Sequence, residues 1–435
     1  MSKTRTLSDN PIKDGQLAVV VGGGVSGLAA ASLLLRLGAR VRILDNKGFS
    51  EDFLARTGHL DLELIAGEHR LEHFQGAALV VPSPGVPWSA LEKPLALAGA
   101  PLCISELELA ASFAHEKIIA VTGTSGKTTT VSLIAAMLEA GGKKVFLGGN
   151  IGTPLSAYIL EKEQGAPAVD ILVLEVSSFQ LQLTRAFHPK IALLLNLSPN
   201  HLDQHRDFAE YRAAKLRIFA NQTPANTAIL GETLFDLVRE YPLRAKVEYF
   251  APSGRFPQTR LLGAHNRANL EAAFLAAREF GVTEEQAALA AQNFAPLPHR
   301  LEQVGETEGV LYIDDSKGTT VESLRVALQS LERPVFLLAG GVFKGGDLEN
   351  LRPLLLEKVK AVALFGGGRE FFERAWQGAV PLSWDERLEG ALRRSRAAAA
   401  PGDIILLSPA TASFDQYRDY RERGNDFQRL ARELP

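Results

Sequence analysis

Short runs of apolar residues alternate with longer amphipathic or alanine- and leucine-rich segments along almost the whole chain. The short runs have the length and the β-branched content of buried strands. They are Leu17–Val21, Val41–Asp45, Leu79–Val81, Ile118–Thr122, Ile171–Glu175, Ile191–Asn196, Val335–Ala339, Ala361–Phe365 and Ile404–Ser408. Segments such as Val131–Ala140 and Leu388–Ala399 have the composition of helices. This alternation predicts an α/β protein whose parallel sheets are covered by helices on both faces.

Two interruptions of this pattern predict domain boundaries. One lies near Gly99–Ser105, before the predicted strand Ile118–Thr122. The other lies near Phe294–His299, where Ala-Pro-Leu-Pro-His breaks a helical pattern. We therefore expect three domains, formed by residues 1–105, 106–296 and 297–435.

Composition and charge narrow the classes of function. The 435 residues are 46% hydrophobic and carry a formal net charge of −3, so no basic surplus favours nucleic acid or an anionic membrane as a partner. The single cysteine, Cys103, excludes an intrachain disulfide and a cysteine-based metal site. Leu17–Leu35 carries no charge, but its glycines favour a strand, a turn and a buried helix over a membrane span. We expect a cytoplasmic monomer without membrane insertion.

The first candidate site follows the first predicted strand. Gly22–Gly27 has the spacing G-x-G-x-x-G and leads into a predicted helix, and Asp45 ends the next strand. Glycines let the backbone approach a pyrophosphate, and a helix N-terminus offers unpaired N–H groups. The pattern predicts a site for a diphosphate-bearing nucleotide, although a tight structural turn has the same spacing. The loop Pro82–Val86 follows another strand end and is equally well a structural turn.

The strongest local motif is Thr-Gly-Thr-Ser-Gly-Lys-Thr-Thr-Thr at residues 122–130. In such a loop the backbone N–H groups surround phosphates, the Lys127 ammonium neutralises their oxygens, and the Thr128 hydroxyl can hold Mg²⁺. Val121 stands where the usual loop has its first glycine, so this loop is a variant. The motif predicts binding of a nucleotide triphosphate.

Two further polar residues follow predicted strands that would end at the same edge of the sheet. Glu175 ends Ile171–Glu175, and its carboxylate is the kind of oxygen ligand that Mg²⁺ prefers. His201 comes shortly after Ile191–Asn196, where a ligand role and an ordinary polar role are equally supported.

The order of these motifs resembles the Mur ligases, which form amide bonds with ATP during bacterial cell-wall synthesis. The resemblance covers nearly the whole chain and continues through Tyr211–Lys215, Gly263–Asn269, Leu297–Arg300, Asp314–Thr319 and Ser408–Ser413. It implies a Rossmann-like N-terminal domain, a central P-loop ATPase-like parallel sheet and a Rossmann-like C-terminal domain. The length, Ser-Pro-Gly-Val and the C-terminal Ala-Ser-Phe-Asp-Gln-Tyr resemble the members that add D-glutamate to a UDP-linked muramoyl-L-alanine substrate.

The resemblance also implies site residues. Contacts to the UDP substrate would come from Gly24, Val25, Ser26, Asp45, Asn46, Lys47, Ser83, Gly85, Asn150, Ser177 and Gln180. ATP would be bound by Gly123, Thr124, Ser125, Gly126, Lys127, Thr128, Thr129, Asn266, Asn269, Arg300 and Asp315. Two Mg²⁺ ions would be held by Thr128, Glu175, His201 and Lys215, the last as a carbamate. D-glutamate would contact Thr319, Lys344, Ser413, Phe414 and Tyr420, and the catalytic residues would be Lys127, His201, Lys215 and Lys317.

Other functions remain open at this point. The nearest are another ligase of this family, such as the L-alanine-adding one, and a folylpolyglutamate synthase. Ser125 stands where the L-alanine-adding ligase typically has histidine, and a folylpolyglutamate synthase should lack the N-terminal G-x-G-x-x-G domain. A nucleotide-binding module without turnover and a dinucleotide oxidoreductase belong to different classes. Asn200, Val342-Phe343 and Tyr420 depart from the pattern expected of the family.

Overall fold

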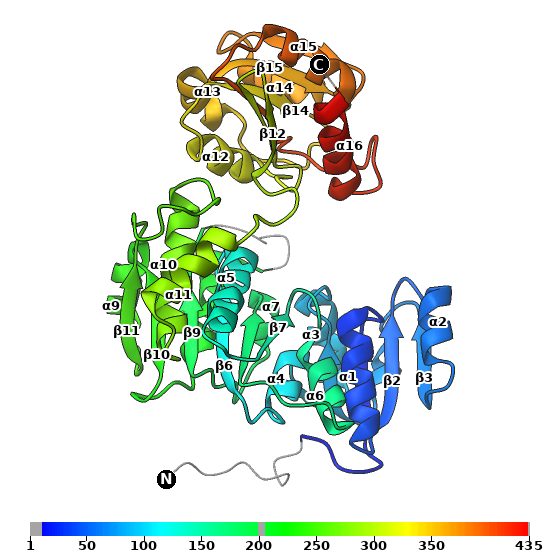
Figure 1. Ribbon diagram of the computed structural model, residues 1–435. Helices are drawn as coiled ribbons and strands as arrows, with labels where there is room; N and C mark the ends of the chain where they lie inside the picture. The colour runs from blue at the N-terminus through cyan, green and yellow to red at the C-terminus, as the bar shows by residue number, and fades with distance from the viewer. Residues whose placement is uncertain (1–10, 199–204, 434–435) are drawn as a thin grey trace. The chain divides into compact units, whose positions relative to one another are not determined.

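The computed structural model describes residues 11–198 and 205–433. The chain divides into two compact units, the first formed by Met1–Phe256 and Ala268–Gln292 and the second by Pro257–Arg267 and Asn293–Pro435. The described residues form three sheets, two in the first unit and one in the second (Figure 1).

The first sheet is parallel throughout and has the strand order β3-β2-β1-β4-β5. Its middle strand is buried over its whole length, because helices cover both faces of a parallel sheet. The strands are β1 (Leu17–Val21), β2 (Arg40–Asp45), β3 (Leu62–Ala66), β4 (Ala77–Pro82) and β5 (Leu102–Cys103). The helices are α1 (Val25–Arg36), α2 (Glu51–Thr57), α3 (Trp88–Leu97) and α4 (Glu106–Ala111).

The second sheet is also parallel, with the order β11-β10-β9-β6-β8-β7. Helices α1 and α4 pack against α6, so the first two sheets share one hydrophobic core (Figure 1). The strands are β6 (Lys117–Thr122), β7 (Val145–Gly149), β8 (Ile171–Glu175), β9 (Ile191–Leu194), β10 (Thr227–Gly231) and β11 (Lys246–Phe250). The helices are α5 (Lys127–Ala140), α6 (Leu155–Glu163), α7 (Ser178–Gln182), α8 (Phe208–Leu216), α9 (Phe235–Glu240), α10 (Ala264–Arg278) and α11 (Glu284–Asn293).

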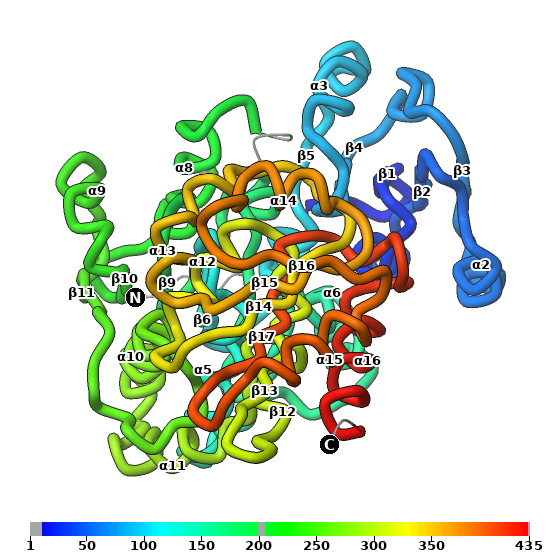
Figure 2. The backbone as a smooth tube through the Cα atoms, turned by 90° about the horizontal axis from the view of Figure 1, so that it is seen from above, coloured from blue at the N-terminus to red at the C-terminus, as the bar shows by residue number. Residues whose placement is uncertain are grey.

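The third sheet has the order β12-β13-β17-β14-β15-β16, and Figure 2 shows the strands following one another in that order. Only the β12–β13 pair is antiparallel among the described strands. Helices α12, α13 and α14 contribute to the core on one face, and α15 and α16 to the core on the other. The strands are β12 (Glu302–Thr307), β13 (Val310–Asp314), β14 (Val335–Ala339), β15 (Val359–Phe365), β16 (Leu382–Asp385) and β17 (Ile404–Leu407). The helices are α12 (Val321–Gln329), α13 (Arg352–Lys358), α14 (Arg369–Trp376), α15 (Leu388–Ala398) and α16 (Tyr420–Glu433).

The predicted α/β class with parallel sheets is confirmed, whereas the three domain boundaries stay a prediction. Two strand predictions were too long, because β9 ends at Leu194 and not at Asn196, and β17 ends at Leu407 and not at Ser408. Asn196 instead turns toward the phosphate loop, and its carbonyl accepts a hydrogen bond from the Thr124 N–H at 3.1 Å. Several strands with polar or glycine residues, such as β7 and β12, were not predicted.

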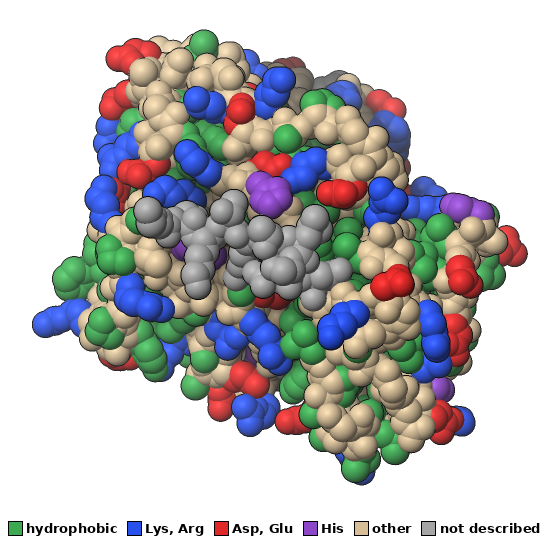
Figure 3. Space-filling model, turned by 90° about the horizontal axis from the view of Figure 1, so that it is seen from below, with side chains coloured by type: hydrophobic (Ala, Val, Ile, Leu, Met, Phe, Trp, Pro, Cys, Tyr) green, Lys and Arg blue, Asp and Glu red, His purple; other side chains and the backbone are tan. Residues whose placement is uncertain are grey.

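The charges on the surface and the character of the helices agree with what the composition predicts. Basic and acidic side chains lie interspersed on the face that Figure 3 shows, as the net charge of −3 suggests. None of the helices in the described part of the chain combines the length and the apolar character needed to cross a bilayer.

A buried carboxylate of α4 holds the segment that follows α7. Both oxygens of Glu108, which is 7% exposed, accept backbone N–H groups, from Ala186 at 2.7 Å and Phe187 at 2.9 Å. We expect Glu108→Ala to lower the free energy of unfolding by about 2 kcal/mol, because it leaves the buried Phe187 N–H and the partly buried Ala186 N–H without an acceptor. Urea unfolding checks this, with Glu139→Ala on the exposed face of α5 as the control. Equal stability of the two variants would contradict the anchoring role.

Candidate functional site

The phosphate loop connects β6 to α5 and depends on two glycines. Gly123 has φ 157° and Gly126 has φ 82°, backbone conformations that favour glycine. A Cβ at Gly126 would lie 2.7 Å from Asn269 Oδ1, so Asn269 of α10 lies directly against the turn. The structure thus brings one predicted ATP ligand from a distant helix to the loop.

Side chains at the loop hold its shape. Lys127 Nζ donates to the carbonyls of Gly123 at 2.9 Å and Thr124 at 3.2 Å. Asn196 Oδ1 accepts from the Ser125 N–H at 2.9 Å, so this neutral amide lies where the loop presents a donor. Thr129, also predicted to bind ATP, is buried in the first turn of α5.

Oxygen atoms suited to Mg²⁺ lie next to this loop. The Thr128 hydroxyl donates to Glu175 Oε2 at 2.8 Å, and Glu175 ends β8 with 3% of its surface exposed. Asn150 Nδ2 donates to the other carboxylate oxygen at 2.9 Å. Hydroxyl and carboxylate oxygens at this spacing fit a hard cation that shares a phosphate. Asn150, predicted to reach the muramoyl group, therefore lies beside the predicted metal ligand.

Lys215 lies buried behind the phosphate loop. Its Nζ donates to Thr122 Oγ1 at 3.2 Å and to the Gly123 carbonyl at 3.0 Å, and only 2% of the residue is exposed. Burial lowers the pKa of Lys215 to about 7; the charge of Lys127 acts in the same direction, and Glu175 opposes the shift. A large fraction of this amine is therefore uncharged near neutral pH.

Two residues that contribute to this region were not predicted as site residues. The Tyr211 hydroxyl lies 3.0 Å from Thr124 Oγ1, and its ring lies under the Lys215 ammonium. His205 stacks on Phe179, and its Nε2 is 2.9 Å from Ser178 Oγ. The four-residue spacing from Tyr211 to Lys215 on one helix face could have indicated the first of these. His201 lies outside the described residues.

The glycine turn at the first sheet has the expected geometry. A Cβ on Gly27 would lie 1.9 Å from the Gly22 carbonyl oxygen. Only glycine at position 27 therefore allows α1 to lie this close to the end of β1. The Asp45 carboxylate accepts from the N–H groups of Gly23 at 2.8 Å and Lys47 at 2.9 Å, which gives it a structural role in the turn. Ser26 Oγ is buried without a hydrogen-bond partner among the described residues. The other predicted contacts here include exposed positions, namely Gly24, Val25, Asn46, Lys47 and Gly85.

A pocket between the first two sheets brings predicted residues of both together. Ser83 from the loop after β4 and Gln180 of α7 line it, together with Trp88 and Phe179. Gln180 also accepts from the N–H and the hydroxyl of Ser177, both at 3.0 Å, in the cap of α7. The first unit thus brings Ser83 and Gln180, from segments that follow strands of different sheets, to one small cavity.

In the second unit, Asp315 lies buried where β13 ends. Ser408 Oγ donates to it at 2.7 Å, and burial raises the pKa of Asp315 to about 7. Arg300 Nε is buried and has no hydrogen-bond partner in the part of the chain that the structure describes. Asn266 Nδ2 donates to the Leu262 carbonyl at 2.8 Å near the start of α10. These three predicted ATP ligands thus belong to the second unit, whereas Asn269 belongs to the first.

The predicted amino-acid residues pair cations with aromatic rings. The Lys317 ammonium lies 5.5 Å from the centre of the Tyr420 ring, and Lys344 lies 5.0 Å from that of Phe414. Ser413 is buried beside Phe414, which is 65% exposed. Thr319 is half-buried two residues beyond Lys317. Ammonium and hydroxyl groups at one edge of the sheet suit an amino acid with two carboxylates.

A buried arginine below this region was not predicted. Arg423 is fully buried, and its guanidinium donates to the carbonyls of Ser316 at 2.9 Å and Thr411 at 3.1 Å. Burial lowers the pKa of Arg423 to about 10, against the effect of Asp415. The sequence alone could not have distinguished Arg423 from the other arginines of α16, which are exposed.

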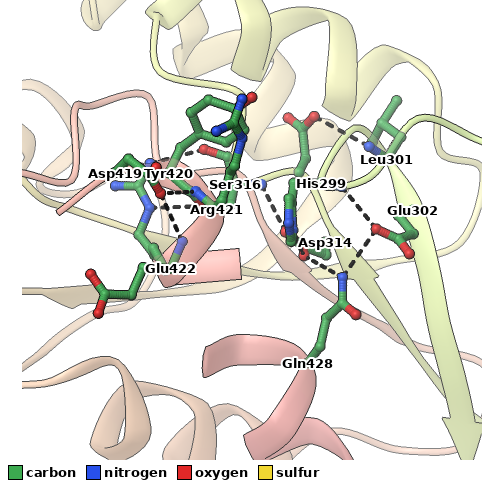
Figure 4. A network of polar contacts seen from close by, with 12 residues as sticks. His299, Leu301, Glu302, Asp314, Ser316, Asp419, Tyr420, Arg421, Glu422 and Gln428 are labelled. Atoms are coloured by element: carbon green, nitrogen blue, oxygen red, sulfur yellow. Dashed lines mark hydrogen bonds and ion pairs between the residues drawn. The ribbon is translucent and has the colours of Figure 1, made fainter. Parts of the chain in front are cut away.

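A second polar network joins β13 to α16 (Figure 4). The His299 Nδ1–H donates to Asp314 at 2.7 Å, and Gln428 donates to Asp314 at 2.9 Å and to Glu302 at 3.0 Å. His299, Glu302 and Asp314 have ligand atoms close enough to hold a metal ion, but the Gln428 amide donates to both carboxylates. The hydrogen bond to Asp314 raises the pKa of His299, against the effect of burial. The network thus holds His299 and Asp314, the residues that directly precede Arg300 and Asp315 in the sequence.

Comparison with known proteins gives consistent matches. Family models match residues 16–99 (Mur ligase MurD-like, N-terminal domain), 121–235 (Mur ligase middle domain) and 299–411 (Mur ligase, glutamate ligase domain). The UDP-N-acetylmuramoylalanine–D-glutamate ligase of Oleidesulfovibrio alaskensis is 53% identical over 421 residues, 96% of this chain and 94% of that one. The protein of the same name from Nitratidesulfovibrio vulgaris is 53% identical over 426 residues, 97% of this chain and 98% of that one.

A solved structure supports the fold. The MurF ligase of Thermotoga maritima in complex with ADP has a TM-score of 0.62 and 18% identity, and the match covers 97% of this chain and 96% of that chain.

The hydrogen bond between His299 and Asp314 predicts that the free energy of unfolding depends on pH. Because the folded-state pKa of His299 is raised, its stabilisation is complete below the ordinary pKa near 6.5 and is lost as pH rises through the folded value. His299→Asn, which tolerates the φ of 61° found here, should lower the free energy of unfolding by about 2 kcal/mol at pH 5.5 and by less at pH 8.5. Urea unfolding at both values checks this, and a loss that grows with pH would contradict it.

Proposed function

The chain belongs to the Mur ligase family, and we propose that it adds D-glutamate to UDP-N-acetylmuramoyl-L-alanine while ATP is cleaved to ADP and phosphate. This reaction is a step of peptidoglycan precursor synthesis. The observation that carries the proposal is the phosphate loop with Glu175 and Lys215 beside it, in a chain that is 53% identical to D-glutamate ligases over nearly its whole length. The small-molecule substrates are anions, and no nucleic acid is needed. We propose that the enzyme acts as a monomer in the cytoplasm.

The phosphate loop would bind ATP through its backbone N–H groups. Lys127 would turn from the carbonyls of its own loop to the phosphate oxygens, and Thr128 and Glu175 would hold Mg²⁺. A bound Mg²⁺ supplies positive charge between the two anions that must meet. Asn269 lies against the same turn. Asn266, Arg300 and Asp315 are the other residues that we propose as ATP ligands.

The chemistry proceeds in two steps. A carboxylate oxygen of the L-alanyl group attacks the γ-phosphorus of ATP, ADP leaves, and an acyl phosphate forms. The uncharged amine of D-glutamate then attacks the acyl carbon, loses a proton, and expels phosphate as the amide bond forms. The chain's task is positioning and charge neutralisation, because two anions and a dianionic amino acid must come together.

Lys215 has the properties needed for carbamylation. Only the uncharged amine reacts with CO₂, and its lowered pKa of about 7 provides that form near neutral pH. As a carbamate, Lys215 would offer anionic oxygens to a second Mg²⁺, together with His201. Burial would shield the carbamate from water.

The remaining predicted residues would bind the two other substrates. The Gly22–Gly27 turn, with Ser26 and Ser83, would hold the UDP portion, and Ser177 and Gln180 would lie toward the muramoyl group. Lys317 and Lys344 would neutralise the carboxylates of D-glutamate, with Thr319 and Ser413 as hydrogen-bond donors and Phe414 and Tyr420 as walls.

Phosphate release tests the proposal directly. With ATP, Mg²⁺ and UDP-N-acetylmuramoyl-L-alanine, we expect release to require D-glutamate and not to occur with L-glutamate or L-alanine. Lys127→Ala should lower the rate by at least about 100-fold, because the loop has no other cation for the phosphates. Release that depends on L-alanine would contradict the assigned amino acid, and near-normal activity of Lys127→Ala would contradict the ATP site.

The carbamate makes a separate prediction. Lys215→Ala should be inactive, and a small added carboxylate such as formate should restore part of the rate by supplying oxygens in the vacated space. The wild-type protein treated with ¹³CO₂ should show a carbamate carbon signal in NMR that the variant lacks. Lys144→Ala, at an exposed position, is the control. Full activity of Lys215→Ala without any additive would contradict the carbamate role.

A further inference from the structure

A third glycine turn connects β15 to α14. Gly366 and Gly368 have φ of 61° and 74°, and Gly368 caps the helix without a side-chain hydrogen bond. Unpaired N–H groups and positive potential at such a turn favour an anion. The proposed reaction does not use this turn.

A carboxylate from the same unit fills the turn. Asp415 Oδ2 accepts a hydrogen bond from the Gly367 N–H at 2.8 Å. A Cβ at Gly366 would lie 2.5 Å from that oxygen, so a larger residue there would displace the carboxylate. The turn and Asp415 therefore form one fitted contact between segments distant in the sequence.

Asp415 lies within the segment that is proposed to bind the amino acid. Ser413 and Phe414 precede it, and the segment continues to Tyr420 at the start of α16. Gln416 Nε2 donates to the Glu386 carbonyl at 2.6 Å and forms a second attachment beside the first.

The same turn is tied to the loop that carries Lys344. The Gly341 N–H donates to the Gly367 carbonyl at 3.1 Å, and Val342 and Ala412 exchange backbone hydrogen bonds of 2.9 and 3.0 Å. The segment with Phe414 and the loop with Lys344 are thus both attached to the Gly366–Gly368 turn. The Lys344 ammonium lies 5.0 Å from the centre of the Phe414 ring. A shift of either segment would move the cation and the ring apart.

We propose that Asp415 is a positioning residue for the amino-acid substrate, because its carboxylate fills the Gly366–Gly368 turn and holds Ser413 and Phe414 beside Lys344. It touches no reacting atom. The inference rests on the proposed function for its substrate, D-glutamate. It adds a determinant of amino-acid affinity that lies outside the residues proposed to contact the amino acid.

Kinetics distinguish positioning from a general effect on folding. Asp415→Ala should raise KM for D-glutamate about 10-fold, as expected for a lost hydrogen bond to a charged group, with KM for ATP within about 2-fold of wild type. Asp415→Asn keeps an acceptor oxygen for the Gly367 N–H and should restore most of the affinity. A merely structural role would not separate the two KM values.

A stability-matched control comes from the opposite end of β17. Asp403 is buried, accepts from the Ala400 N–H at 2.9 Å and pairs with Lys360 at 2.6 Å. Asp403→Ala should lower the melting temperature at least as much as Asp415→Ala and leave KM for D-glutamate unchanged. An equal rise of that KM in both variants, or no rise in Asp415→Ala, would overturn the proposal.

Hydrogen–deuterium exchange tests the anchor independently of turnover. In the protein without substrates, the amides of residues 413–417 should exchange faster in Asp415→Ala than in wild type and in Asp403→Ala. Unchanged exchange would overturn the anchoring. If the wild type shows no D-glutamate-dependent phosphate release, the proposed function fails, while the exchange result still decides whether Asp415 holds the segment.

Discussion

The buried amine of Lys215 constrains the whole central site. It lies where β6 becomes the phosphate loop and bonds to Thr122 and Gly123 there. Burial makes the protonated form of Lys215 unfavourable, and repulsion from the cation Lys127 adds to this cost in free energy. The carboxylate of Glu175 is the nearby group that offsets the cost, and the register of β6 and β8, which pairs Val121 with Glu175, places it there. The strand pairing and the chemistry of the site thus depend on each other.

Three glycine turns of similar form end strands in the three sheets, and they differ in the group that faces them. Asp45 fills the turn at β1 and Asp415 the turn at β15, each through one backbone N–H. At the phosphate loop the corresponding acceptor is the neutral amide of Asn196. A fixed carboxylate would repel a triphosphate, whereas an amide would not. The loop after β6 is thus the one of these three described turns in which the group that accepts from the turn is uncharged.

The sequence was informative where the chemistry is local. The phosphate loop and Glu175 lie within short motifs at strand ends. The geometry of parallel sheets therefore predicted that they lie close together. The hydrogen bond between Thr124 and Tyr211 joins residues 87 positions apart, and no local pattern indicates it. Strand β12 was missed because its residues, Glu302–Thr307, are polar and lie at a sheet edge. The residues of the amino-acid site came from family resemblance, because no short motif marks them.

The helix α10 belongs to both units. Its first turn, with Asn266, is part of the second unit, and from Ala268 onward it is part of the first, with Asn269 against the phosphate loop. An α-helix turns by about 100° per residue. A codon inserted or deleted between Asn266 and Asn269 would therefore turn one asparagine by about 100° relative to the other around the axis of α10.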